Sequence, residues 1–358
     1  MTGSTDDADL DPVVAALRDD PAFLAGRFAL TDDGRGVAER LGLDEGRLRR
    51  LLLCKAPTPS RFAADVRAIA GLVTADPSAL TATLREVEAV AGLRGVRETL
   101  RLGSAEGVLA AARDETDDHM GPAADREVQL RELADGVWRA CPEEVREARD
   151  IDAAVAWSAA LALVSLPRLS VAAVREWLAD RGVPTAGGDD GVPLRGFLVA
   201  YRGVGLVFVD GTLDAAERRF TVAHEVGHFL LDYQLPRRRV LRDAPGLIEV
   251  VDGVRPATPS DRAQAVLARV PLGPHTHRLG HHNVEDTASR FALELLSPLG
   301  EALDAVRETT ERQTSYRFAL GTAARRLADR FQIPPYAART RARQALDALD
   351  IHPDFFER

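Results

Sequence analysis

The feature that most constrains the fold is a pair of histidines and a glutamate set in an otherwise apolar helical stretch. The segment Thr221–Tyr233 (TVAHEVGHFLLDY) contains the pattern HExxH as His224, Glu225 and His228. Positions i and i+4 of a helix lie one turn apart on one face, so both imidazoles can reach one metal ion. Glu225 is offset along the helix, beside the ion, where a general base belongs. Burying these groups is costly unless something neutralises them, which favours a helix packed around a metal site.

A catalytic zinc site takes three protein ligands and keeps one position open. The continuation that supplies a third histidine, HExxHxxGxxH, is absent because Leu231 and Gln234 occupy the required positions. A carboxylate on a second helix is the other common solution. Glu285 shares one helical face with Ala288 and Ala292, whose small side chains would let the two helices pack closely. The alternatives are a chance HExxH with two ordinary core histidines, and a glutamate that only favours a helix N-terminus.

Two segments together resemble the ImmA/IrrE metallopeptidases: Arg219–Leu231 (RFTVAHEVGHFLL) and Glu285–Pro298 (EDTASRFALELLSP). The signature of that family pairs an FTxAHExGHxLL helix with an ExxANxFAxxLLxP helix, and the resemblance covers about residues 127–298. It implies a gluzincin-like site with one Zn²⁺ per chain. The implied zinc ligands are His224, His228 and Glu285, and the implied base is Glu225. Family members are bacterial and often cleave a helix-turn-helix repressor, which releases stress or mobile-element genes.

The sequence departs from the family pattern at two places. Ser289 stands where the second motif has Asn, and the connection Pro236–Asn283, rich in proline and without a sustained period, looks longer than usual. This connection carries four histidines, which are His275, His277, His281 and His282. They are interpreted as part of a solvated loop in preference to a second metal site, and one of them is a candidate to stabilise a transition-state oxyanion.

A helix-turn-helix pattern lies near the N-terminus. Within Val37–Leu51, Ala38, Gly42 and Leu48 follow the spacing of such a motif. Its second helix would expose three arginines as candidate contacts for duplex DNA, namely Arg47, Arg49 and Arg50. A plain helical hairpin used for packing is the alternative. The arginine-rich C-terminal stretch follows the same spacing less closely. A basic helical face there could bind either nucleic acid or an acidic partner.

The patterns predict a mostly helical α+β fold. A metallopeptidase domain over 125–300, with a small β-hairpin and an active-site helix, is flanked by a helical domain over 1–115 and a basic helical region over 301–358. The helix-turn-helix-like segment spans 35–55. Gly196–Tyr201 and Gly205–Val209 are the predicted hairpin strands, with Arg202 and Gly203 as the turn, and 127–178 reads as helical.

Composition narrows the class of protein. The chain has 358 residues, 46% of them hydrophobic, and a formal net charge of -9, which argues against nucleic-acid or membrane binding through the whole surface. Two cysteines without a CxxC exclude a disulfide framework, and no apolar run is long enough for a membrane span. A cytoplasmic protein without membrane association is therefore expected.

These observations predict a zinc-dependent, site-specific endopeptidase. Its expected substrate is a protein, such as a helix-turn-helix repressor in a stress or mobile-element response, and its N-terminal module is a candidate DNA-binding unit. The rival interpretations are a DNA-binding transcription regulator and a toxin–antitoxin-type partner, in which the peptidase fold serves as a sensor without turnover.

Overall fold

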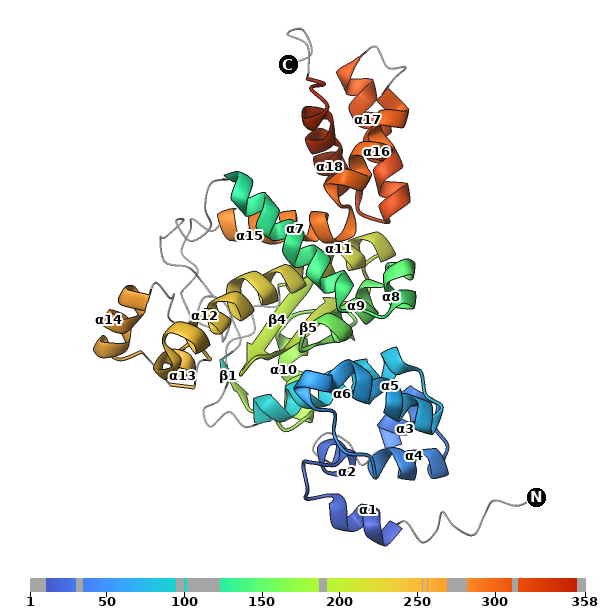
Figure 1. Ribbon diagram of the computed structural model, residues 1–358, viewed down its shortest axis with the longest axis vertical. Helices are drawn as coiled ribbons and strands as arrows, with labels where there is room; N and C mark the ends of the chain where they lie inside the picture. The colour runs from blue at the N-terminus through green and yellow to red at the C-terminus, as the bar shows by residue number, and fades with distance from the viewer. Residues whose placement is uncertain are drawn as a thin grey trace, which may run out of the picture.

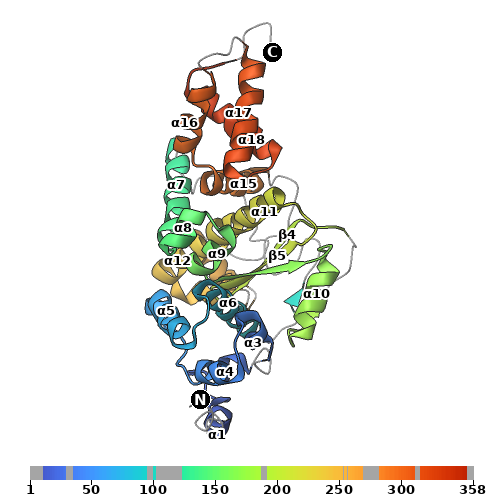
Figure 2. The same cartoon turned by 90° about the vertical axis from the view of Figure 1, so that its right-hand side faces the viewer.

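The computed structural model describes residues 11–29, 35–94, 100–101, 123–186, 192–252, 254–255, 257–268, 282–310 and 315–352. These residues form a mostly helical molecule with one three-stranded mixed sheet, so the predicted α+β class is confirmed. Figures 1 and 2 show an elongated arrangement in which the N-terminal helices lie at one end, the C-terminal helices at the other, and the sheet between them.

The sheet has the order β2-β5-β4. Strands β4 (Gly196–Tyr201) and β5 (Val204–Asp210) form the predicted antiparallel hairpin, with Phe197 opposite Phe208. The turn residues Arg202 and Gly203 have φ angles of 50° and 90°. Both values are positive, as a two-residue type I′ turn requires, and this turn matches the natural twist of the two strands.

The third strand corrects the helical prediction for 127–178. Residues Leu161–Leu166 form β2, which pairs in parallel with β5 from Leu161 opposite Gly205 to Leu166 opposite Asp210. The run LALVSL follows directly on a helix and has no turn signal before it, so its periodicity resembles that of a buried helix segment. This run forms a strand because it pairs with β5, which lies far along the chain.

Helices cover both faces of the sheet (Figure 2). Helix α11 (Ala215–His228) packs on one face, against residues such as Leu198 and Val207. Helices α6 (Pro77–Arg94) and α10 (Val171–Asp180) pack on the other, against residues such as Phe208. Because side chains alternate along a strand, the two faces belong to two separate apolar clusters.

The remaining helices before the sheet fall into two groups. Near the N-terminus lie α1 (Asp11–Leu17), α2 (Leu24–Phe28), α3 (Arg35–Leu41), α4 (Glu45–Leu52), a 3₁₀ turn at Pro59–Arg61 and α5 (Phe62–Val73). Between α6 and the sheet come α7 (Ala123–Arg139), α8 (Glu143–Ala148) and α9 (Ile151–Ser158). Two two-residue strands, β1 (Leu100–Arg101) and β3 (Thr185–Ala186), pair in parallel. Because α6 covers the sheet, the segment predicted as an N-terminal domain contributes directly to the central layer; the predicted boundaries themselves stay a prediction.

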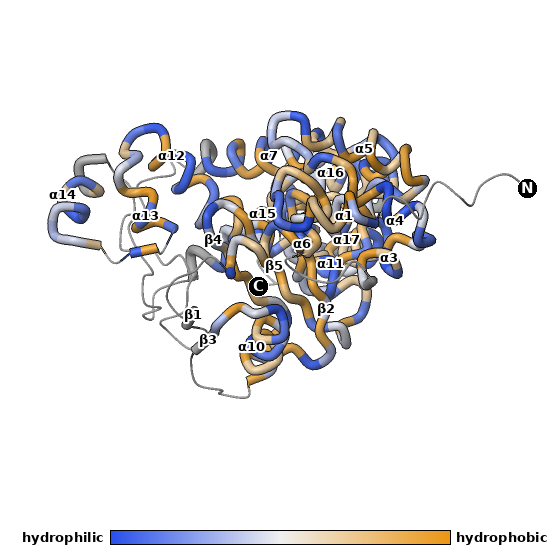
Figure 3. The backbone as a smooth tube through the Cα atoms, turned by 90° about the horizontal axis from the view of Figure 1, so that it is seen from below, coloured by the Kyte–Doolittle hydropathy of each residue, from blue (hydrophilic) through white to orange (hydrophobic). Residues whose placement is uncertain are grey.

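The connection predicted as a loop contains helices where the structure describes it. These are α12 (Leu235–Asp243), a 3₁₀ turn at Pro245–Leu247, α13 (Ile248–Val251) and α14 (Pro259–Ala268). Their small apolar cluster includes Val240 and Leu247 and is distinct from the main core. Figures 1 and 3 show α13 and α14 standing to one side of the molecule.

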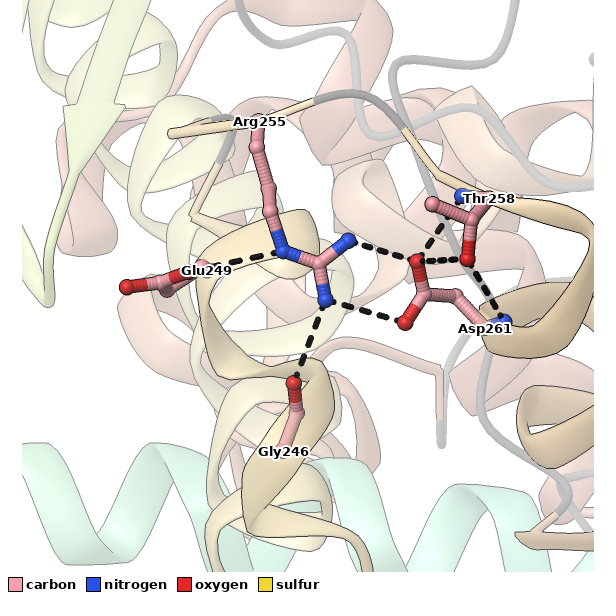
Figure 4. Close-up of polar contacts among 5 residues, drawn as sticks. All are labelled: Gly246, Glu249, Arg255, Thr258 and Asp261. Carbon is pink, nitrogen blue, oxygen red and sulfur yellow. Dashed lines mark hydrogen bonds and ion pairs between the residues drawn. The ribbon is translucent and has the colours of Figure 1, made fainter.

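A polar network joins the parts of this insertion (Figure 4). The Arg255 guanidinium binds both carboxylate oxygens of Asp261 at 2.5 and 2.9 Å, and lies 3.4 Å from Glu249. Thr258 donates to Asp261 through its hydroxyl at 2.6 Å and through its backbone N–H at 2.8 Å. These bonds hold the start of α14 against α13. They also lower the pKa of the Asp261 carboxyl well below its usual range, chiefly through the bond from Arg255.

The C-terminal part consists of α15 (His282–Leu296), α16 (Leu299–Thr310), α17 (Tyr316–Phe331) and α18 (Pro335–Ala348). Helices α16, α17 and α18 pack on one another, and α15 packs on α7 and α11. Glu294 of α15 and Arg341 of α18 are both buried and form an ion pair at 2.9 Å. Across the described helices, none has the length and apolar character needed to cross a bilayer.

Candidate metal centre

Helix α11 carries the HExxH pattern and is fixed at both ends. The side chain of Asp214 accepts a hydrogen bond from the backbone N–H of Glu217 at 2.9 Å, which caps the N-terminus. At the other end the chain continues without a break into a π-helical turn at Phe229–Gln234 and then into α12. Single π turns inside helices are frequent at functional sites. Val222, Val226 and Phe229 are fully buried and anchor the helix on the core.

The three predicted ligands converge. The Nε2 atoms of His224 and His228 lie 3.0 Å apart. One carboxylate oxygen of Glu285 lies 3.1 Å from Nε2 of His224, and the other lies 3.5 Å from Nε2 of His228. All the donor atoms fall within 4.8 Å of one another. Two imidazoles and one carboxylate at this spacing form the donor set that zinc takes in catalytic sites.

Close packing of α11 on α15 brings Glu285 to the histidines. Gly227 faces α15, and a Cβ atom there would lie only 3.2 Å from the Cα of Ala288 and 3.1 Å from the ring of Phe291. Ala288 and Ala292 are fully buried, as their small size led us to expect. A larger residue at either contact would push the helices apart and move the Glu285 carboxylate away from the imidazoles.

Two side chains that the sequence analysis did not assign to the site hold the other nitrogens of the imidazoles. Asp232, in the π turn, lies 2.8 Å from Nδ1 of His228 through its carboxylate, and Ser289 lies 3.3 Å from Nδ1 of His224 through its hydroxyl. Such partners fix the orientation of a metal-ligating histidine and leave its Nε2 free to coordinate. The spacing HExxHxxxD in the sequence could have pointed to Asp232. Ser289 stood out only as the residue in place of Asn in the second family motif.

Glu225 lies beneath the first residue of β4. A Cβ atom on Gly196 would come within 2.5 Å of Oε1 of Glu225 and 2.8 Å of the Thr221 methyl group, so only glycine fits there without displacement. Burial raises the pKa of the Glu225 carboxyl, and the nearby histidines oppose this shift. A carboxyl whose pKa moves upward toward neutrality is a stronger base than an exposed one.

The electrostatics of the cluster favour positive charge at its centre. Burial disfavours the charged imidazole of His228, but its bonds to Asp232 and Glu285 outweigh this effect and raise its pKa to about 10. Bonds from the two histidines keep the pKa of Glu285 well below its usual range. Three carboxylates thus surround two imidazoles, and a divalent cation fits both the donor set and the charge.

The arginines predicted to contact DNA lie on α4, where carboxylates lie close to Arg47 and Arg49. Arg47 lies 3.3 Å from Asp44. The Arg49 side chain is only 17% exposed and contacts Asp11 at 2.7 Å and Glu45 at 2.6 Å. Arg50 is exposed. The α3–α4 hairpin exists, with Gly42 at a φ of 61° in its turn, but the paired arginines favour the packing interpretation of this helix.

Three of the four histidines of the insertion fall outside the part of the chain that the structure describes. His275, His277 and His281 lie outside the described residues, and His282 is the first residue of α15. Among the described residues, His224, His228 and Glu285 form the one group of three or more side chains that could hold a metal.

Comparison with known proteins supports the peptidase interpretation for part of the chain. A family model described as the IrrE N-terminal-like domain (Peptidase_M78) matches residues 191–246. No curated protein matches the chain. The matched segment runs from before β4 to the end of α12, so it contains His224, Glu225 and His228 but not Glu285. Over this segment the chain is similar to the ImmA/IrrE peptidases.

Proposed function

We propose that the protein is a zinc-dependent endopeptidase. The observation that carries this proposal is the convergence of His224, His228 and Glu285 from two helices, with a half-buried Glu225 next to them. The ligands would be these three residues. A zinc ion held there supplies Lewis acidity, which polarises a carbonyl group and makes water more acidic.

Glu225 has the position of the general base. It follows a candidate ligand directly, so it reaches the reacting water without occupying the cation site. Gly196 and Thr221 confine its carboxylate on one side. In this role Glu225 accepts the proton of the attacking water and later delivers it to the leaving amine.

The sheet offers a place for the substrate. Strand β4 begins at Gly196, beside Glu225, and within the described part of the chain it pairs with β5 alone. An extended peptide can add to such an edge through backbone hydrogen bonds, which tolerates many side chains. The substrate class is therefore a protein, and we propose a regulatory protein such as a helix-turn-helix repressor, on the strength of the family resemblance.

The decisive variant is Glu225→Gln. Gln keeps the size and hydrogen-bonding reach of the side chain but cannot accept a proton, so proteolysis should fall about 10²–10⁴-fold. Zinc content, measured by elemental analysis, should not change because no proposed ligand is altered. The substrate is sought by comparing new protein N-termini in cells that produce wild type or variant.

A second variant tests the ligand set. Glu285→Ala should lose zinc at a micromolar concentration of chelator at which wild type keeps one zinc per chain. If the variant retains stoichiometric zinc, Glu285 is not a ligand. If zinc-loaded wild type and Glu225→Gln give the same N-termini under every stress, the fold serves as a sensor without turnover.

A further inference from the structure

The end of the π turn that follows α11 is held to the sheet at two points. The backbone N–H of Gly203, in the β4–β5 turn, donates to the hydroxyl of Tyr233 at 2.7 Å. The side-chain amide of Gln234 donates to the carbonyl of the same glycine at 2.7 Å. One residue of the hairpin turn thus fixes the last two residues of the π turn.

The Tyr233 hydroxyl also connects the sheet to the insertion. Besides accepting the bond from Gly203, it donates to Oδ1 of Asp252, the C-cap residue of α13, at 3.0 Å. Both side chains are buried. Burial, and then the charge of Asp252, raise the pKa of the Tyr233 phenol above its usual range, so the hydroxyl keeps its proton and remains a donor. Removal of this hydroxyl would break both connections.

Arg237 adds a third element, α12, to the same group of contacts. Its Nε and Nη2 atoms donate to the two carboxylate oxygens of Asp252 at 2.8 and 3.1 Å, which fixes the direction of the carboxylate. The guanidinium lies over the hairpin turn, because a Cβ atom on Gly203 would come within 3.1 Å of Nη1. We call Gly203, Tyr233, Arg237 and Asp252 the Tyr233 cluster. Figures 1 and 3 show α12 between the sheet and α13.

The Tyr233 cluster lies next to the residue that orients a candidate ligand. Asp232 precedes Tyr233 in the chain, and its carboxylate lies 2.8 Å from Nδ1 of His228. A shift of Tyr233 therefore moves the Asp232 backbone and carries the carboxylate away from the imidazole. The ring of Tyr233 also packs at 5.6 Å on that of Phe229, the residue that follows His228. The cluster is thus connected to His228 through Asp232 and through Phe229.

We propose that Tyr233 and Asp252 are positioning residues that couple the docking of α13 on the hairpin turn to metal binding at His228. This inference rests on the metal site proposed above. While the cluster is intact, the end of the π turn is fixed and Asp232 faces the imidazole. When its bonds are broken, the turn loses an anchor and the His228 ring loses its fixed orientation. Coupling between two events is reciprocal, so a bound metal also favours docked α13.

The test variant is Tyr233→Phe in the full chain, which removes the hydroxyl and keeps the ring against Phe229. Competition with a chromogenic chelator should show zinc binding about tenfold weaker than in wild type, the lower end of what loss of an outer partner costs. With Co²⁺ in place of zinc, the visible absorption bands should change, because they report the coordination geometry. The matched control is Tyr201→Phe, which removes the hydroxyl of another buried tyrosine and should change neither quantity.

Hydrogen exchange separates a positioning role from a merely stabilising one. In wild type, zinc should slow amide exchange across residues 248–252, measured relative to 62–73 in α5 so that general stabilisation of the fold is subtracted. In Tyr233→Phe this zinc-dependent protection should disappear. Asp252→Asn keeps an acceptor for the hydroxyl but loses the charge that binds Arg237, so its zinc affinity should lie between those of wild type and Asp252→Ala.

Two results would overturn the inference and leave the metal site intact. The first is a wild-type zinc affinity and cobalt spectrum in Tyr233→Phe. The second is zinc-dependent protection of residues 248–252 that is equal in wild type and variant. If wild type itself binds no zinc, the proposed metal site and this inference both fail. Circular dichroism checks the helix content of each variant, and if Tyr233→Phe loses helix, the same comparisons are made with Asp252→Asn.

Discussion

Asp232 and Ser289 decide how the imidazole rings are turned, although neither is a candidate ligand. Asp232 is 9% exposed at its side chain and lies 2.8 Å from the Nδ1 atom of His228. The convergence of the candidate ligands could be predicted because HExxH and the alanine face around Glu285 are local patterns. The roles of Asp232 and Ser289 depend on a π turn and on contact between two helices, which no local pattern encodes.

Replacing Asp232 should therefore weaken metal binding more than a surface change does. We expect Asp232→Ala to lower zinc affinity about 10–100-fold, because the Nδ1 atom of His228 loses its buried partner and the ring its orientation. Asp232→Asn keeps an acceptor and should lose less. Competition with a chromogenic chelator measures the affinity, and Asp243→Ala on the exposed side of α12 is the control. Equal affinities for Asp232→Ala and this control would contradict the assigned role.

Gly196 should be intolerant of any side chain. In Gly196→Ala the new methyl group would meet Oε1 of Glu225 at 2.5 Å, so the carboxylate must move. We expect proteolysis to fall at least about tenfold while zinc content is retained, since the ligands lie elsewhere. Gly71→Ala in α5, where a Cβ atom meets nothing within 4 Å, is the matched control and should retain activity. Full activity in Gly196→Ala would show that the carboxylate is not confined by β4.

At the scale of elements, the strand pair joined by a short turn was predicted correctly, whereas the strand that pairs with a distant segment was not. The β4–β5 hairpin was predicted correctly because its turn lies between its own two strands. Strand β2 was missed because its partner, β5, lies more than forty residues further along the chain, at Leu161 opposite Gly205. Parallel pairing of this kind leaves no mark on the sequence of either strand alone.

The helices of the insertion were missed for a different reason. Its prolines were interpreted as loop signals, yet Pro236 and Pro259 lie in the first turns of α12 and α14. Proline is favoured at this place because the first amide groups of a helix have no intrahelical partner. The same holds for Pro335 at the start of α18. In these three described helices proline therefore marks the start of the helix.

Within the insertion, Asp261 should hold α14 in place. We expect Asp261→Asn to increase amide hydrogen exchange across residues 259–265, because it removes the charge that binds Arg255. The lowered pKa of Asp261 means that its contribution is present above its usual pKa of about 4. Protection in the wild type should thus stay constant down to about pH 4 and decline as the pH falls further toward the folded-state value. Asp329→Asn, on the exposed surface of α17, serves as the control, and identical exchange in both variants would refute the role of Asp261.

At the scale of the whole molecule, one buried ion pair joins the C-terminal helices to the metal-site layer. Glu294 follows Glu285 on α15, and its carboxylate binds Arg341 of α18 at 2.9 Å and lies 3.4 Å from Arg131 of α7. The exposed fractions of the Arg341 and Glu294 side chains are 4% and 6%. Loss of Glu294 would remove the carboxylate that pairs with the buried Arg341 guanidinium.

We therefore expect Glu294→Gln to reduce the free energy of unfolding by about 3–5 kcal/mol, measured by urea denaturation. The double variant Glu294→Leu with Arg341→Leu removes both charges and should recover part of the loss, since apolar replacement of buried pairs is often tolerated. If Glu294→Gln lowers the free energy of unfolding by less than about 1 kcal/mol, this ion pair is no stronger than an exposed one.

The separation of the candidate ligands along the chain has a consequence for the lifetime of the protein. His224 and Glu285 are 61 residues apart, so an ion shared between them closes a long loop, much as a disulfide would. Restricting the unfolded chain to a loop of this length removes conformational freedom equivalent to about 4 kcal/mol. The ion would then act as a reversible cross-link between the two ends of the insertion. Cellular zinc supply would set how often the chain opens, and thereby how quickly cellular proteases degrade it.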